Sequence, residues 1–72
     1  EGAVEDYTRA IALNPRYAEA YVNRGNKYGS QGNLRAALAD FEKALGVAPA
    51  NWRHRKVLEK KLAEVRKLMT GK

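Results

Sequence analysis

The 72-residue sequence has no cysteine, one histidine and only short apolar runs. Without cysteine the chain forms neither a disulfide framework nor a thiolate metal site. His54 stands among basic residues, with no nucleophile beside it that a general base would activate. The apolar runs are too short for a membrane-spanning helix or a secretory signal peptide. We therefore expect no enzyme, no bound metal and no cofactor.

The positive charge of the chain is confined to one end. The formal net charge is +6, and residues 1–50 contain equal numbers of basic and acidic residues. Residues 51–72 contain eight basic residues but only two acidic ones, Glu59 and Glu64, and account for the whole excess. A basic protein suggests nucleic acid or an anionic surface when its charge is spread over a face. Here the charge describes one segment.

Two prolines and a glycine divide the chain into helical segments. Pro15 and Pro49 each stop a helix, and Gly32-Asn33 breaks the pattern between them. Between these breaks apolar residues recur every three or four positions, and no segment shows the strict alternation of a half-buried strand. These patterns predict an all-α fold with four helices, near residues 2–13, 18–30, 34–46 and 52–69.

The sequence repeats itself at an offset of 34 residues. At this offset nine of the first fifteen aligned positions are identical or alike, in one unbroken register. The identical pairs are Ala3/Ala37, Asp6/Asp40, Ala10/Ala44 and Pro15/Pro49. A period of this length built from two short helices is typical of tetratricopeptide arrays.

Residues 18–51 resemble one complete tetratricopeptide repeat. Residues 1–17 resemble the second half of a preceding repeat, and residues 52–72 resemble the helix that caps such arrays. The family pattern of aromatic, glycine, tyrosine, small, aromatic, small and proline falls on Tyr21, Gly25, Tyr28, Ala37, Phe41, Ala44 and Pro49. The resemblance implies antiparallel helix pairs stacked as a short right-handed superhelix, which is a fragment of an α-solenoid.

One position departs from the family pattern. The residue before the family's glycine is usually leucine, and here it is Arg24. We expect the arginine stem to pack while its head pairs with a carboxylate, for which Asp6 and Asp40 are candidates. Contact between Arg24 and a ligand is the less favoured alternative. Gly25 and Ala37 are predicted to be small because paired helices approach closely there.

The resemblance implies a protein–protein interaction scaffold. In this family the first helices of successive repeats line a concave groove that receives peptide segments. Asparagine amides and neighbouring cations suit a peptide backbone or a carboxylate, so we expect an acidic peptide partner, such as a C-terminal tail. The implied groove residues are Glu19, Val22, Asn23, Asn26 and Ser30 on the complete repeat, and Arg53, Lys56, Val57 and Lys60 on the cap.

A subset of the family, the carboxylate-clamp cochaperones, grips acidic C-terminal tails of heat-shock chaperones. The run Tyr21-Val22-Asn23-Arg24 is similar to the asparagine-bearing strip of those clamps, and Arg53 falls where a clamp cation lies. The next clamp cation falls on Val57, so the match is incomplete. The alternative is that the asparagines line a polar groove without a particular ligand.

Two further alternatives concern the ends of the chain. Val4, Tyr7 and Ile11 form a stripe on the first helix whose usual partner helix is absent, which predicts a fragment of a longer array or a homo-oligomer. The basic last helix is expected to be a solvated cap face, with Trp52 covering the end of the core. Its contact with nucleic acid or an anionic membrane is the other alternative, less favoured than a protein partner.

Overall fold

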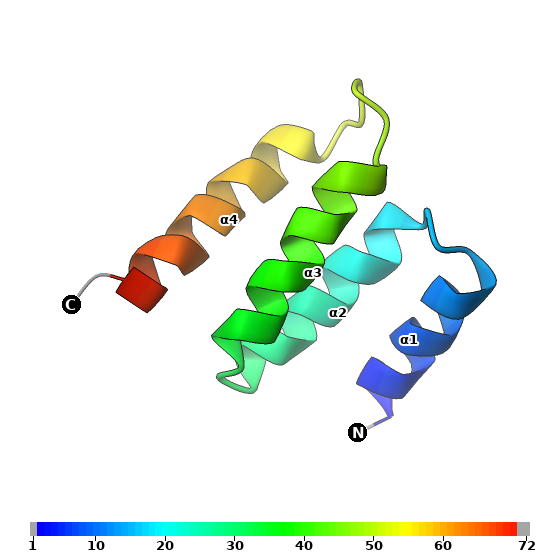
Figure 1. Ribbon diagram of the computed structural model, residues 1–72, viewed down its shortest axis with the longest axis horizontal. Helices are drawn as coiled ribbons and strands as arrows, with labels where there is room; N and C mark the ends of the chain where they lie inside the picture. Colours follow the sequence, from blue (N-terminus) through cyan, green and yellow to red (C-terminus); the bar gives the residue numbers. More distant parts are fainter. Residues whose placement is uncertain (1, 71–72) are drawn as a thin grey trace.

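Four α-helices make up most of the chain. The computed structural model describes residues 2–70, in which α1 spans Ala3–Leu13, α2 Ala18–Ser30, α3 Leu34–Val47 and α4 Arg55–Thr70 (Figure 1). No strand occurs in this range, which confirms the all-α prediction. Within the same range no helix combines the length and the apolar character that crossing a membrane requires.

Local sequence signals set the helix ends. Gly32 adopts a left-handed φ of 82° in the turn between α2 and α3, a conformation that glycine reaches without steric cost. Asn33 then caps α3, because its side-chain oxygen accepts a hydrogen bond of 3.3 Å from the Ala36 amide. At the other end α3 stops at Val47, two residues before Pro49. The first three helices therefore lie close to the predicted ranges.

The start of α4 corrects the sequence prediction. The last helix was expected near residue 52, but α4 begins at Arg55. The intervening residues form turns, in which the Trp52 amide donates to the Pro49 carbonyl at 3.0 Å and the Arg55 amide donates to the Trp52 carbonyl at 3.1 Å. Trp52 itself packs against the hydrophobic core, as predicted. The periodic apolar pattern of this segment begins only at Leu58, so it did not define the helix start.

The helices are stacked in order rather than closed into a bundle. α2 and α3 form an antiparallel pair, α1 packs against α2, and α4 packs against α3 (Figure 1). The molecule is flat, with principal extents of 38, 32 and 13 Å. Because α2 and α4 both run opposite to α3, they run in the same direction (Figure 1). This arrangement is the stacking of antiparallel helix pairs that the sequence predicted.

The closest approach between α2 and α3 occurs at Gly25. A Cβ atom added to Gly25 would lie 2.6 Å from Cε1 of Phe41, well inside van der Waals contact. Phe41 is the largest fully buried side chain, and Ala37 and Ala44 on the same helix are completely buried. The helices can lie this close because small residues occupy the interface. The prediction for Gly25 and Ala37 is therefore confirmed.

Arg24 joins three helices through one hydrogen-bonded network. Its Nε and Nη2 atoms donate to the two carboxylate oxygens of Asp40 on α3, at 2.8 and 2.7 Å. Its Nη1 donates to the hydroxyl of Thr8 on α1 at 3.0 Å. The predicted pairing with Asp40 is confirmed, whereas Asp6 is exposed on α1 and makes no ion pair among the described residues.

The surroundings of Arg24 stabilise its charged form. The hydrogen bonds to Asp40 raise the pKa of Arg24, and the opposing effect of partial burial is smaller. The guanidinium carbon also lies 5.8 Å from the centre of the Tyr21 ring and 5.9 Å from that of Tyr28, within cation–π range. The arginine thus fills the place of the usual leucine with its stem and keeps its charge paired.

The outer flank of α1 is only partly covered. Val4, Tyr7 and Ile11 are half-buried rather than exposed, and α1 contributes no fully buried residue. Leu13 at the end of this helix is 83% exposed. The stripe that the sequence predicted to be open therefore has contacts on one side, against α2. Self-association through this flank stays a prediction.

The close approach at Gly25 predicts opposite effects for two Gly→Ala substitutions. Gly25→Ala should lower the free energy of unfolding by about 1–3 kcal/mol, because the added Cβ would lie 2.6 Å from the buried Phe41 ring and force it to shift. Gly46→Ala should raise the free energy of unfolding by up to about 1 kcal/mol, because this helical position on α3 has nothing within 4 Å. Urea unfolding followed by circular dichroism measures both, and equal effects would contradict the close approach.

The Arg24–Asp40 pair predicts strong coupling in a double-mutant cycle. Asp40→Ala alone should cost about 2–3 kcal/mol, because it leaves a cation with 19% exposed side chain without its carboxylate. Arg24→Leu alone should cost a similar amount, because it leaves the Asp40 carboxylate without its cation. The free energy of unfolding of the double variant should lie within about 1 kcal/mol of that of the unmodified chain. Additive losses in urea unfolding would show that the pair does not act as a unit.

Candidate functional site

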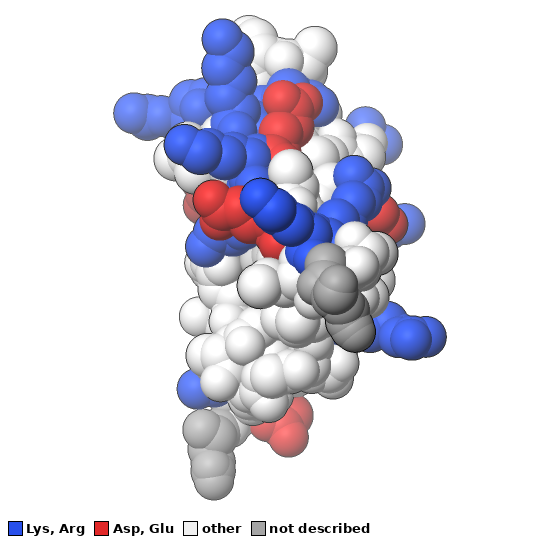
Figure 2. Space-filling view, turned by 90° about the vertical axis from the view of Figure 1, so that its left-hand side faces the viewer, with Lys and Arg blue, Asp and Glu red and all other residues white. Residues whose placement is uncertain are grey.

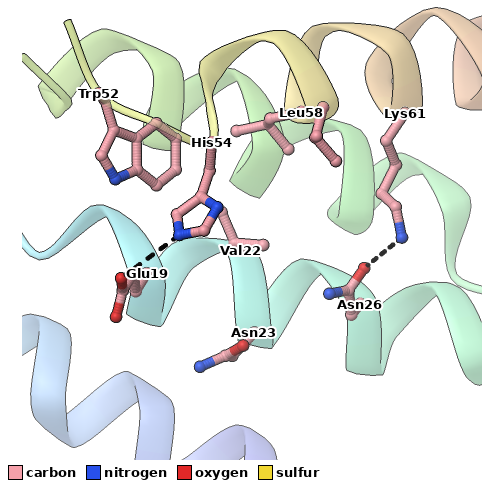
Figure 3. Close-up of a pocket in the computed structure, with 9 residues that line it drawn as sticks. Glu19, Val22, Asn23, Asn26, Trp52, His54, Leu58 and Lys61 are labelled. Atoms are coloured by element: carbon pink, nitrogen blue, oxygen red, sulfur yellow. Dashed lines mark hydrogen bonds and ion pairs between the residues drawn. The ribbon is translucent and has the colours of Figure 1, made fainter.

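A groove lies between α2 and α4 and continues over the turn that precedes α4 (Figure 3). Its volume is about 280 Å³. The first helix of the central pair supplies one wall, and the turn and the first half of α4 supply the other. The residues that line it are Glu19, Val22, Asn23, Asn26, Trp52, His54, Val57, Leu58 and Lys61.

Two polar contacts bridge the groove at a constant sequence separation. Nε2 of His54 lies 3.9 Å from Oε2 of Glu19, and Nζ of Lys61 donates to Oδ1 of Asn26 at 3.1 Å (Figure 3). The partners in each contact are 35 residues apart in sequence. Because α2 and α4 are parallel, one separation holds along the whole groove. The two helices therefore face each other in a single register.

Apolar side chains occupy the middle of the groove. Val22 on α2 and Val57 on α4 lie between the two polar contacts, and Leu58 closes the bottom as part of the core. Val57 is 66% exposed, so its methyl groups are available to a ligand. At the turn, the Trp52 ring meets His54 edge-on, with ring centres 5.4 Å apart. The groove thus has an apolar centre between polar ends.

Most of the residues predicted on α2 line this groove. Glu19, Val22, Asn23 and Asn26 all belong to its wall, and Val57 does so on α4. Ser30 does not, because it lies beyond the end of the groove. It lines a neighbouring hollow between α2, α3 and the second half of α4. The hydroxyl of Ser30 donates to the Lys27 carbonyl at 2.8 Å, which satisfies the end of its own helix.

The cations predicted on the cap lie outside the groove lining. Arg53 is in the turn before α4, and Lys56 and Lys60 are exposed on α4. They were assigned from the sequence offset of 34, whereas the facing residues are separated by 35. One residue turns a helix by about 100° and moves a side chain to another face. Lys61 therefore takes the place that Lys60 was expected to hold.

Four residues that line this wall were not predicted from the sequence. The core stripe of α4 begins at Leu58, and the residues that border this stripe face α2. A helix face that contains Leu58 also contains the positions three or four residues away. That reasoning would have found His54 and Lys61, but not Trp52, which lies six residues before Leu58 in the turn that precedes α4.

Some basic residues of α4 contact the rest of the fold, and others are exposed to solvent. Figure 2 views the molecule from the side of α4, and in it Lys and Arg side chains gather in the upper part of the surface. Arg55 is structural, because its Nη2 contacts three carbonyl oxygens at the end of α3, within 3.2–3.3 Å. Arg66 pairs with Glu42 at 2.7 Å. The basic run therefore stabilises the packing of α4 as well as forming a solvated face.

His54 has a carboxylate neighbour but no catalytic surroundings in the groove. The groove lining contains no serine, threonine or cysteine that a histidine would activate. His54 and Glu19 are both about half-exposed to solvent. Within residues 2–70 no three acidic or histidine side chains gather in a way that would hold a metal ion. What the groove offers chemically is hydrogen bonding, charge and apolar contact.

Comparison with known proteins identifies the family. The family model described as "Tetratricopeptide repeat" matches residues 18–51, and the one described as "TPR repeat" matches residues 1–32. The chain is 34% identical over 67 residues to a DnaJ homolog subfamily C member 7 homolog of Dictyostelium discoideum. It is 43% identical over 51 residues to human tetratricopeptide repeat protein 6. Human serine/threonine-protein phosphatase 5 is 36% identical over 70 residues.

These matches cover most of this chain but little of each relative. They include 92%, 71% and 97% of the chain, yet 12%, 10% and 13% of the respective relatives. One relative is an enzyme by name, and the 70 residues that it shares with this chain overlap residues 1–51, which the family models match as repeats. No solved structure matches at a significant level. The chain belongs to the tetratricopeptide repeat family.

Proposed function

We propose that the groove between α2 and α4 binds an extended segment of a partner protein through an acidic group, such as a C-terminal carboxylate. Tetratricopeptide repeats mediate protein–protein interactions, and this chain belongs to that family. In this proposal residues 18–51 are the complete repeat, residues 1–17 are the second helix of the preceding one, and residues 52–72 are the cap. The groove lies where the complete repeat meets the cap.

One observation carries the acidic preference. Lys61 lines the groove, and its only hydrogen bond among residues 2–70 is to the neutral amide of Asn26. No carboxylate of the described part of the chain pairs with it. A carboxylate that enters the groove would therefore gain a charge-assisted hydrogen bond without breaking an ion pair. The amides of Asn23 and Asn26 can add neutral hydrogen bonds to the same ligand.

The surrounding charge supports the same polarity. Lys56 and Lys60 are exposed on α4 next to the groove, although they do not line it. Cations at the rim of a site accelerate the approach of an anion and contribute less once the complex has formed. The exposed Val57 and the half-buried Val22 offer apolar contact for a ligand side chain. The proposal thus assigns affinity to the groove and attraction at a distance to the rim.

Fluorescence of Trp52 offers a direct test. It is the single tryptophan of the chain, and it lines the groove. Titration with an acetylated peptide of alanine and glutamate that ends in a free carboxylate should change its emission. Lys61→Glu should weaken binding at least about tenfold, because a hydrogen bond to a charged group contributes about 1.5–3 kcal/mol. The affinity should also fall as salt is added.

Lys67→Glu is the matched control for that substitution. Lys67 is exposed on α4 and is not part of the groove lining, so this variant changes the net charge equally without touching the groove. It should weaken binding less than threefold through long-range charge alone. Equal losses for the two variants would contradict the groove. Tight, strongly salt-dependent retention of RNA or anionic vesicles by both variants would favour the basic-surface alternative instead.

A further inference from the structure

We infer that the groove binds groups of opposite charge at its two ends, so that its ligand is oriented with an acidic group at Lys61 and a basic group at Glu19. This inference rests on the proposed function and specifies the ligand more closely. The preferred partner segment is then not merely acidic. It carries a cation at a fixed distance from its carboxylate.

The two ends of the groove differ in charge. Glu19 is the only acidic residue of the lining, and its side chain is 58% exposed. Its one ion-pair partner among residues 2–70 is His54, whose Nε2 lies 3.9 Å away. Lys61 marks the other end beside Asn26. The Glu19 carboxylate is therefore exposed enough to attract a cation of the ligand.

The distance between the ends follows from the helix. Glu19 and Asn26 are seven residues apart on α2, which corresponds to a rise of about 10.5 Å at 1.5 Å per residue. On the facing wall His54 and Lys61 are also seven residues apart in sequence, with His54 in the turn before α4. Between the two ends the groove is lined by Val22, Asn23 and Val57, which carry no charge. The groove therefore presents a negative end, an uncharged centre and a positive end in that order.

A short extended peptide matches this order. In a polyproline II conformation every third side chain returns to the same face after about 9.3 Å. That spacing agrees with the separation between Glu19 and Lys61 within the reach of a flexible lysine side chain. When the acidic group is the C-terminal carboxylate, nothing follows it, so the basic residue must precede it by three positions. The side chains between them lie against Val22 and Val57.

Three peptides that differ at one position test the inference. All are acetylated, of equal length, and end in glutamate with a free carboxylate, with Lys, Ala or Glu three positions before that residue. We expect the Lys peptide to bind about threefold to tenfold more tightly than the Ala peptide, and the Glu peptide to bind most weakly. Titrations are followed by Trp52 fluorescence.

Substitution of Glu19 separates this effect from general electrostatics. Glu19→Gln should abolish the difference between the Lys and Ala peptides, and Glu19→Lys should reverse the order of Lys and Glu peptides. Glu59→Gln is the matched control, since Glu59 is exposed on α4, is not part of the groove lining, and loses the same charge. It should leave the preference intact. A lysine placed six positions before the carboxylate should give no gain.

The possible failures are distinguishable. If the three peptides bind equally well and Lys61→Glu still weakens all of them, the inference about a basic group at Glu19 is overturned. The proposed binding of an acidic group in the groove then stands. A preference for the Lys peptide that survives Glu19→Gln also overturns the inference. If no peptide binds, or if Lys61→Glu and Lys67→Glu act alike, the proposed function fails and the inference fails with it.

Discussion

The close approach of α2 and α3 at Gly25 is the constraint on which the rest of the structure depends. The Phe41 ring lies where a side chain at Gly25 would be, so the two helices form one rigid pair. Small side chains at Ala37 and Ala44 allow the same closeness along the interface. With its inner face used in this way, α2 presents its other sides to α1 and to the groove. The position of every groove residue on α2 follows from this packing.

The opposite wall of the groove depends on how α4 packs against the pair formed by α2 and α3. Leu58, Leu62 and Val65 bury one stripe of α4 in the core. Arg55 contacts the carbonyl groups at the end of α3, where the helix dipole is negative, and thereby holds the start of α4. Arg66 pairs with Glu42 farther along. Much of the basic character of the C-terminal segment is therefore a consequence of packing, and Lys61 is left facing the groove.

The fold was predictable from sequence because its repeat is both regular and physically constrained. Gly25, Phe41 and the two prolines mark a close approach and two helix ends that few other residues allow, and the prolines recur at the offset of 34 residues. The pairing of Arg24 with a carboxylate was predictable in the same way. Choosing Asp40 over Asp6 was not, because that choice depends on which helix approaches the guanidinium in space.

The groove was only half predictable for a related reason. On α2 the repeat pattern fixes which residues face outward, and Glu19, Val22, Asn23 and Asn26 follow from it. On α4 the wall depends on the turn between α3 and α4, where no periodic signal exists, and on a helix rotation of one residue. Pattern matching at the repeat offset therefore selected Lys60 instead of Lys61. Long-range packing, rather than local propensity, decides such a register.

The register between α2 and α4 is the central claim, and nuclear Overhauser contacts between side chains test it most directly. The structure predicts contacts from His54 to Glu19 and from Lys61 to Asn26, with none from Lys60 to α2. Contacts from Lys60 or Lys56 to α2 in place of these would show that α4 is rotated, and that the groove described above has a different wall.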